Sequence, residues 1–457
     1  MRAKLIVIFF SLVLLKSLVW LLLVPIFQIP DEPSHFSIVE FVAEHGRRPH
    51  PRREQVTPSE VIEAAKIVNF NWQINHPMWH GYDTGWLSQL KTLTSDSRQQ
   101  FTENIWQTSL KRPPLYYYLA APVYWLGGHT FLARFFAVRL LSVVLHLLTV
   151  WLAYLAAKKI FKSFWLGLTV SGLVAFQPML SFLSVGVHYD PLAILLATVF
   201  IYWIIAKRWW LSLFAALAGI LVKPDLIFLL VFWLWLKFTG KQRWLFVLIA
   251  FGLLLLLAWL AGPLSAAIAA MTVGYFDRLL YITNLNEYTS MAKFVVTGIF
   301  SGQLLAQLIH YFQVTAAIHW AQVFPWYWGT FGWLEISLPA WVFILLKLLL
   351  LFSLLGWVKW WFKDRSGNYG WLWGFLLLQA GVIVANDFKV FISSGDIYGI
   401  QGRYLFPAIL AQMIILVFGL KQWLSERFLA PVLIGLSLLL NLIGLLTVFQ
   451  YFGNVWQ

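Results

Sequence analysis

The stretch LIVIFFSLVLLKSLVWLLLVPIF, residues Leu5–Phe27, decides the class to which this protein belongs. As a helix it is long enough to cross a hydrocarbon core of about 30 Å. Arg2 and Lys4 precede it, as basic residues precede the apolar part of a signal peptide. The stretch is longer than the apolar part of a signal peptide and lacks a small-residue cleavage site, so we predict an uncleaved first transmembrane helix.

Similar apolar windows recur along the whole chain. Of its 457 residues, 60% are hydrophobic and 11% are charged, which excludes a soluble globular protein. The net charge of +14 is spread over short loops and forms no aromatic-interleaved basic patch, so nucleic acid is not an expected partner. The absence of cysteine excludes disulfides, thiolate catalysis and Cys-ligated zinc. The sequence therefore predicts an all-α polytopic membrane protein.

Basic clusters set the predicted orientation. All of them fall on one side when the chain is threaded through about eleven helices, and the positive-inside rule makes that side cytoplasmic. The N-terminus then lies inside and the C-terminus outside. The clusters are Arg2 and Lys4; Lys158, Lys159 and Lys162; Lys207 and Arg208; Lys237, Lys241 and Arg243; Lys359, Lys363 and Arg365; and Lys421 and Arg427. The predicted helices are 4–27, 131–156, 163–183, 190–206, 209–222, 224–238, 244–262, 336–357, 369–386, 404–420 and 429–450.

This threading predicts one domain over residues 1–457 with two large extracytoplasmic loops, 28–130 and 263–335. The first loop is far longer than a helix connection needs and mixes polar, aromatic and amphipathic stretches, so we expect it to be ordered. The second is rich in Tyr, Trp and Gln and is expected to contain interfacial helices. Its segment Trp326–Glu335 is aromatic enough to stack on sugars, but an aromatic belt at the membrane surface is the preferred interpretation. The pair 209–222 and 224–238 is either a hairpin of short helices or one kinked helix.

The first candidate site residues follow the end of the first helix, in the segment IPDEPSHF, residues 29–36. One interpretation makes Asp31 the N-cap of a helix over 32–45. That interpretation explains neither Glu32 nor His35, which gain nothing from a place beside a bilayer. A positioned carboxylate is what a transferase needs to take a proton from an attacking hydroxyl. Asp31, Glu32 and His35 are also a candidate ligand set for a divalent cation, which is the less favoured hypothesis.

The same loop ends in KRPPLYYY, residues 111–118. A basic residue at headgroup depth, Arg112, can hold a lipid phosphate by charge-assisted hydrogen bonds, with Tyr116 beside it. An interfacial helix with a rigid Pro-Pro start and a tyrosine belt explains the segment equally well. The segment therefore has two open interpretations, one functional and one structural.

Further charged residues lie at other predicted outer helix ends. Asp190 either caps the helix that follows it or belongs to a site. Lys223 lies within a long apolar run, where it must snorkel to the outer surface or face a cavity or partner. Arg403, followed by Tyr404, offers a planar fork of donors to a phosphate or carboxylate. Arg403 shares its predicted side of the membrane with Asp31, Asp190 and Lys223.

Four segments in this order resemble a family of bacterial membrane proteins catalogued as domain of unknown function 2142. That family is grouped with the GT-C glycosyltransferases, alongside protein mannosyltransferases and aminoarabinose transferases. The resemblance covers nearly the whole chain and implies a GT-C-like topology. The segments are Ile29–Phe36, Arg112–Tyr117, Phe331–Glu335 and Gln401–Pro407.

The resemblance implies a polyprenyl-phosphate sugar donor and a catalytic carboxylate in the first outer loop. By position, Asp31 would be the base and Glu32 its neighbour. Asp190 matches the acidic residue of the second outer loop, although Val-His-Tyr precedes it where Asn or Arg is expected. Arg134 and Arg139 resemble the arginine that opens the same helix in the mannosyltransferases. The candidate substrate-binding residues are His35, Arg112, Tyr116, Asp190, Lys223, Arg403 and Tyr404.

The sequence thus predicts an inverting glycosyltransferase of the cytoplasmic membrane that serves the cell envelope. It would move a sugar from a polyprenyl-phosphate donor to a hydroxyl of a glycan, lipid or protein acceptor on the extracytoplasmic face. A transporter or flippase of lipid-linked saccharides is one alternative, which predicts internal repeats and ionisable residues near the midplane. A non-catalytic lipid-binding protein of envelope assembly is the other.

Overall fold

The computed structural model describes residues 2–50, 54–71, 76–77, 85–93, 100–102, 109–110, 112–237, 304–363, 369–395 and 399–453. Across these ranges the chain is mostly helical, and its strands form three short two-stranded sheets. Six of the described helices are long and apolar enough to cross a membrane. The prediction of an all-α polytopic membrane protein is confirmed. The predicted helix over 244–262 lies outside the described residues, so the total of about eleven stays a prediction.

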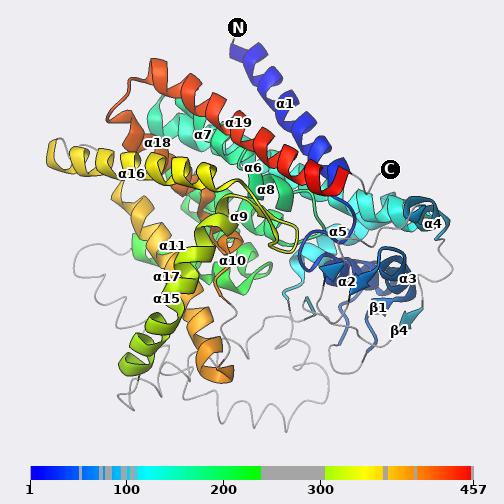
Figure 1. Ribbon diagram of the computed structural model, residues 1–457. Coiled ribbons are helices and arrows are strands. Elements are labelled where there is room, and N and C mark those ends of the chain that lie inside the picture. Colours follow the sequence, from blue (N-terminus) through cyan, green and yellow to red (C-terminus); the bar gives the residue numbers. More distant parts are fainter. Residues whose placement is uncertain are drawn as a thin grey trace.

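The six candidate spans come from both ends of the chain (Figure 1). They are α1 (Arg2–Leu23), α6 (Phe131–Phe161), α16 (Ala340–Lys363), α17 (Gly370–Ser394), the 3₁₀ helix η3 (Gly402–Ala408) continued by α18 (Ile409–Lys421), and α19 (Glu426–Phe452). Shorter apolar helices complete the bundle: α7 (Phe164–Ala175), α8 (Pro178–Leu183), α9 (Asp190–Ile205), α10 (Trp209–Ile220) and α11 (Ile227–Lys237).

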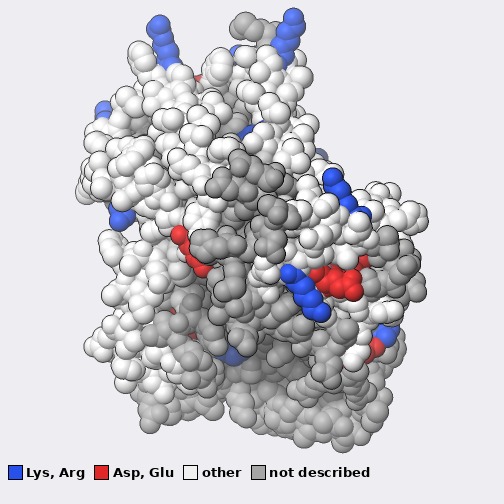
Figure 2. All heavy atoms as spheres, turned by 45° about the vertical axis from the view of Figure 1, so that its right-hand side comes forward, with Lys and Arg blue, Asp and Glu red and all other residues white. Residues whose placement is uncertain are grey.

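Burial separates central helices from peripheral ones. The short helices α7 and α9 are apolar all round and almost completely buried between α6, α18 and their neighbours. By contrast, α1, α16 and α19 bury one stripe and expose large apolar side chains along the other. Uncharged side chains make up most of the described surface in Figure 2, where lysines and arginines project at the top, the end at which α1 begins. Such an apolar periphery suits contact with lipid.

The predicted single helix over 163–183 is wrong in one respect, because the chain breaks between α7 and α8. Pro178 occupies the first position of α8, where its missing N–H costs nothing. Gln177 is the N-cap, and its side chain accepts a hydrogen bond from the Leu180 N–H. Hydropathy did not reveal this break, because the residues on both sides of it are apolar.

Polar side chains from distant helices satisfy the carbonyls that the break exposes. Lys16 of α1 donates from Nζ to the Ala175 carbonyl over 2.8 Å, and also lies 3.0 Å from Ser181 Oγ and 3.3 Å from His146 Nε2. Asn441 of α19 donates to the Phe176 carbonyl over 3.1 Å. A broken helix is tolerated inside a membrane only where neighbours restore such bonds. The break is therefore built into the bundle.

The segment 209–238 folds as a hairpin of short helices, which is one of the two predicted alternatives. The 3₁₀ helix η2 (Pro224–Leu226) joins α10 to α11, and Lys223 lies at its start. Trp233 of α11 donates from Nε1 to the Trp209 carbonyl at the beginning of α10, over 3.0 Å. That contact fixes the two helices as antiparallel neighbours.

The described part of the predicted loop 28–130 packs at one end of the bundle, on the right of Figure 1. Its elements are α2 (Glu32–His45), β1 (Thr57–Pro58), α3 (Ser59–Ile67), β2 (Phe70–Asn71), β3 (His76–Pro77), α4 (Trp86–Thr92), β4 (Phe101–Thr102) and α5 (Leu115–Leu126). Strand β1 pairs with β4, and β2 with β3. Helix α5 packs on both α2 and α6, which ties the loop to the bundle.

The described part of the predicted loop 263–335 contains one long helix, α15 (Leu304–Trp328), and the hairpin of β5 (Thr330–Phe331) with β6 (Ile336–Ser337). The expected aromatic belt is wrong for the best-buried rings. Phe331 is fully buried, with its ring centroid 5.5 Å from that of Trp20 and 5.6 Å from that of Phe182. Tyr327 packs on Phe406. These rings join the hairpin to the bundle instead of facing headgroups.

Candidate functional site

Charged side chains from four chain connections meet at one end of the bundle. They come from the start of α2, the α8–α9 connection, the α10–η2 connection and the start of η3. We name the set of Asp31, His188, Asp190, Lys223 and Arg403 the charged cluster. Antiparallel helices bring these connections together because each lies at the same end of its helices.

Asp31 occupies the N-cap position of α2 without capping it. Its carboxylate makes no hydrogen bond to the first turn, so the capping role considered above is wrong for the side chain. Instead Asp31 Oδ2 accepts a hydrogen bond from Arg403 Nη2 over 3.1 Å, and 22% of the side chain is exposed. Its backbone is left-handed, with φ 65°. Such conformations are costly for residues other than glycine and concentrate at functional sites, although aspartate and asparagine adopt them most readily.

Arg403 is held from three sides. Its Nε donates to Gln401 Oε1 over 2.6 Å, its Nη2 donates to Asp31, and its Nη1 lies 3.5 Å from His188 Nε2. Gly402 lets the backbone come this close to α15, because a Cβ there would lie 2.1 Å from the Tyr327 nitrogen. The guanidinium of Arg403 therefore donates hydrogen bonds as predicted, and the carboxylate that it binds is that of Asp31.

Lys223 does not snorkel to the surface. Its Nζ donates to Asp190 Oδ1 over 3.1 Å, and both side chains are buried. The Nζ also lies over the rings of Tyr189 and Tyr404, 5.4 and 4.9 Å from their centroids. Burial by itself lowers the pKa of Lys223, but the charge of Asp190 and then Tyr189 raise it above its usual value, so Lys223 stays charged.

Arg112 is the third cation near these tyrosines. Its guanidinium lies 5.6 Å from the centroid of the Tyr189 ring. Tyr189 is the largest cause of the raised pKa of Arg112. Among the described residues, it forms neither an ion pair nor a side-chain hydrogen bond. Asp225 contributes to the field around Arg112, but its Oδ1 accepts a hydrogen bond from Asn386 over 2.6 Å. As far as the described residues go, the donors of Arg112 are thus available to an anionic ligand.

Two buried histidines lie between the carboxylates. His35 Nδ1 lies 2.9 Å from Tyr117 Oη, and its ring meets that of His188 edge-on with 4.3 Å between centroids. Burial lowers the pKa of both histidines. His188 lowers the pKa of His35 further, and Arg403 lowers that of His188. Both rings are therefore neutral. His188 was not among the predicted site residues, although its position two residues before Asp190 was a signal for it. Its Nδ1 accepts a hydrogen bond from the Asp190 N–H over 3.0 Å.

Glu32 lies beside Asp31 but points into a separate network. Its two oxygens accept hydrogen bonds from Arg139 Nε and Nη2 at 2.8 and 2.7 Å, and from the Val187 and Phe27 N–H groups at 2.9 Å each. Arg139 also donates to the carbonyls that end α1, and both side chains are completely buried. This network joins α1, α2, α6 and the α8–α9 connection. Glu32 consequently positions the cluster without facing it.

The predicted ligand set for a cation is not assembled. Asp31 is bonded to Arg403, Glu32 to Arg139 and His35 to Tyr117, so the three side chains share no common centre. Within the described ranges there is no group of three or more His, Cys, Asp or Glu side chains suited to a metal ion. The geometry favours ion pairing over metal ligation at the start of α2.

The two predicted tyrosines differ in their surroundings. Tyr116 is fully buried, edge-on to Tyr117 with 5.5 Å between ring centroids. Tyr404 lies under both Lys223 and Arg403, whose guanidinium carbon is 5.8 Å from its centroid. Tyr404 therefore contacts the charged cluster directly, whereas Tyr116 supports the wall behind it.

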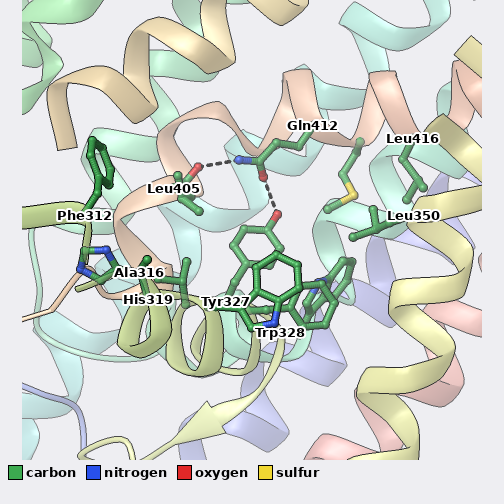
Figure 3. A pocket seen from close by; sticks show the side chains of 13 residues that line it. Phe312, Ala316, His319, Tyr327, Trp328, Leu350, Leu405, Gln412 and Leu416 are labelled. Atoms are coloured by element: carbon green, nitrogen blue, oxygen red, sulfur yellow. Dashed lines mark hydrogen bonds between the residues drawn. The ribbon is translucent and has the colours of Figure 1, made fainter. Parts of the chain in front are cut away.

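A cavity of about 570 Å³ lies next to η3. Its walls come from α15, α16, η3 and α18 and are almost entirely apolar (Figure 3). One polar contact crosses it, in which Gln412 accepts from Tyr327 Oη and donates to the Leu405 carbonyl over 3.0 Å. Leu405 lines the cavity and Arg403 belongs to the charged cluster, so η3 contributes to both. The remaining lining residues include Phe312, Ala316, His319, Trp320, Leu350 and Leu416.

The chain has detectable similarity to known proteins. A family model described as "Predicted membrane protein (DUF2142)" matches residues 14–411. No curated protein matches the chain. The crystal structure of the Archaeoglobus fulgidus oligosaccharyltransferase in its apo form is similar at a TM-score of 0.37 and 14% identity. That alignment covers 98% of this chain and 55% of the archaeal one, so the chain spans about half the length of that protein.

Proposed function

Since the chain belongs to the DUF2142 family of predicted membrane proteins, as its motifs indicated, we propose that its charged cluster is the active site of a GT-C-type glycosyltransferase. The substrate would be a sugar on a polyprenyl phosphate, and the product a glycosylated acceptor hydroxyl. One observation carries the proposal. A partly exposed carboxylate, Asp31, has a left-handed backbone and pairs with Arg403, while Lys223 and Arg112 belong to the same site and Arg112 makes no ion pair within the described residues.

The cations fit the phosphate of a lipid-linked donor. Arg112, Lys223 and Arg403 surround Tyr189 and Tyr404, and guanidinium groups bind phosphate oxygens with paired hydrogen bonds. The apolar cavity next to η3 is suited to the hydrocarbon chain. A lipid with its phosphate at Arg403 and its chain along Leu405 would contact η3 at both residues.

The proposed reaction needs one base and one stabilised leaving group. Asp31 takes the proton of the acceptor hydroxyl while the hydroxyl oxygen attacks the anomeric carbon. The bond from that carbon to the phosphate oxygen breaks, and its electron pair leaves with polyprenyl phosphate, so the configuration inverts. Arg112, Lys223 and Arg403 stabilise the negative charge that develops on the leaving phosphate. Glu32 takes no proton in this scheme, because both of its oxygens already accept hydrogen bonds.

The proposal places the charged cluster on the extracytoplasmic side of the cytoplasmic membrane, in a single GT-C-like domain. Contacts at the far end of the bundle agree with the antiparallel threading. Glu426 accepts a hydrogen bond from Ser163, and Lys359 Nζ donates to the Gln422 carbonyl over 2.8 Å. All four residues lie at or near helix ends that the basic clusters assign to the cytoplasm.

Cysteine labelling tests this orientation. The chain has no native cysteine, and Ser88 and Ser425 are both exposed. In intact cells an impermeant thiol reagent is expected to label Ser88→Cys and to leave Ser425→Cys unlabelled until the membrane is opened. The reverse pattern would mean that the cluster faces the cytoplasm.

Arg112→Gln is expected to weaken binding of polyprenyl phosphate by about tenfold or more, since a charge-assisted hydrogen bond contributes roughly 1.5–3 kcal/mol. Photocrosslinking with a polyprenyl-phosphate probe measures this. Arg47→Gln is the control, because Arg47 lies in the same loop but pairs with Glu54 near the surface. Arg403→Lys is expected to weaken binding too, as lysine keeps the charge and loses the fork. Equal crosslinking of Arg112→Gln and wild type would remove Arg112 from the donor site.

One observation bears on the transporter alternative. Lys16 and His146 are ionisable and buried inside candidate spans, which is where a transporter would place them. Their contacts with the α7–α8 break account for them structurally. Sugar transfer by the purified protein, from a polyprenyl-phosphate donor and without a membrane gradient, separates the two functions.

A further inference from the structure

A second group of ionisable side chains, most of them buried, lies where the described part of loop 28–130 meets α6, apart from the charged cluster. It joins four elements: Glu40 and Glu44 come from α2, Glu60 from α3, Tyr124 from α5 and Arg134 from α6. We name these five residues the acidic cluster. Glu40 is completely buried in this group, and the guanidinium of Arg134 pairs with Glu60.

The single cation is already committed to Glu60. Arg134 Nη2 donates to Glu60 Oε2, and both side chains are completely buried. Arg134 Nη1 donates to the His129 carbonyl over 2.7 Å, and the guanidinium carbon lies 5.2 Å from the centroid of the Tyr124 ring. These contacts fix Arg134 with its charge directed at Glu60.

Glu40 has no comparable partner. It is completely buried, and neither of its carboxyl oxygens accepts a hydrogen bond from a donor in the part of the chain that the structure describes. The Tyr124 hydroxyl, which faces the same group, is likewise buried without a hydrogen-bond partner there. A carboxylate without donors is far more costly to bury than a neutral carboxyl. The geometry around Glu40 thus favours its protonated form.

We propose that Glu40 and Glu60 share one proton, in a carboxyl–carboxylate hydrogen bond that latches α2 to α3. In this pair Glu40 donates and Glu60, held ionised by Arg134, accepts. Two carboxyls at one buried place cannot both ionise cheaply, and one cation neutralises only one of them. Burial and then the charge of Glu60 raise the pKa of Glu40 well above its usual value, with a smaller contribution from Glu44. The positive charge of Arg134 beside Glu60 disfavours a metal cation at this place, so the occupant we propose is a proton.

The latch makes this part of loop 28–130 sensitive to acidity. In the unfolded chain Glu40 loses its proton near pH 4.3, whereas in the folded protein it keeps the proton to a higher pH. Stability is therefore greatest at low pH and falls as the pH rises toward the folded-state pKa. The groups that face Glu40 are Glu44 on its own helix, Glu60, Tyr124 and Arg134. Because Asp31 is the N-cap of α2, acidity that acts on Glu40 acts on the helix that follows the proposed base.

Thermal unfolding of the full-length protein in detergent, from about pH 5 to about pH 8.5, tests the latch. The unfolding midpoint of the wild type is expected to fall as the pH rises. Glu40→Gln keeps the shape and the donor while removing the titration, so its midpoint should lose this fall and equal or exceed the wild type at the alkaline end. Glu60→Gln should lower the midpoint at every pH, because it leaves Arg134 without its counter-ion. Glu63→Gln, on the exposed face of α3, is the matched control and should behave as wild type.

A second readout does not depend on unfolding. Infrared spectra at neutral pH should contain the carbonyl band of a protonated carboxylic acid in the wild type, and this band should be absent from Glu40→Gln. A Glu40→Gln midpoint as low as that of Glu60→Gln at alkaline pH would mean that Glu40 is ionised and would overturn the proposal. Stabilisation of the wild type by added calcium, abolished in Glu40→Gln, would also overturn it by identifying a metal as the occupant. Neither measurement requires sugar transfer, so either one can disprove the latch without disproving the proposed function.

Discussion

Asp31→Asn is expected to slow sugar transfer by a factor of about 10² to 10⁴, which is the usual cost of losing general-base assistance. Asparagine cannot take the proton of the acceptor hydroxyl, yet it fits the place of Asp31 in other respects. It tolerates the left-handed backbone at φ 65°, and its amide oxygen can still accept the hydrogen bond of Arg403. Because the Asp31 side chain makes no capping bond, the free energy of unfolding should fall by only about 1 kcal/mol.

The measurement compares initial rates of transfer from a polyprenyl-phosphate sugar with thermal unfolding of the same preparations. Glu54→Gln is a suitable control, since Glu54 is a partly exposed carboxylate of the same loop that pairs with Arg47. Its rate should equal that of the wild type. If Asp31→Asn transferred sugar at the full rate, Asp31 would serve only as the partner of Arg403, and the proposed site would lack its base.

Arg139→Met is expected to give the largest loss of stability of any single substitution considered, about 3–5 kcal/mol, because it leaves a buried carboxylate without its counter-ion. Glu32 would retain only the Val187 and Phe27 N–H donors. The Val24 and Pro25 carbonyls, just after α1, would also lose their hydrogen bonds from Arg139. Since the network joins α1, α2, α6 and the α8–α9 connection, the charged cluster should loosen with it.

A double substitution separates the charge from the packing. Glu32→Gln combined with Arg139→Met removes both buried charges, so its loss of stability should be smaller than the sum of the two single losses. Chemical unfolding in detergent measures all three variants. A loss below about 1 kcal/mol for Arg139→Met would indicate that water reaches the pair, since exposed ion pairs contribute no more than that.

The sequence by itself determined the class of the protein and the residues from which the site is drawn. Apolar windows longer than a bilayer needs required membrane-spanning helices, and short connections required antiparallel neighbours. Polar residues at helix ends on one side, such as Asp31, Asp190, Lys223 and Arg403, therefore had to lie at one end of the bundle. That reasoning found every member of the charged cluster except His188, because it depends on the order of helices along the chain and not on their packing.

Only the tertiary structure decided which of these groups pair and which conformations they take. Arg403 lies 372 residues from Asp31 and Arg139 lies 107 residues from Glu32, and each pairing depends on how the helices rotate about their axes. The same holds for Lys16, which reaches the α7–α8 break from another helix, and for Glu40, whose lack of a cation follows from Arg134 pointing at Glu60. Hydropathy records how long an apolar segment is. The direction in which each side chain points is set by close packing between helices, because a rotation that buried a charge without its partner would cost several kcal/mol.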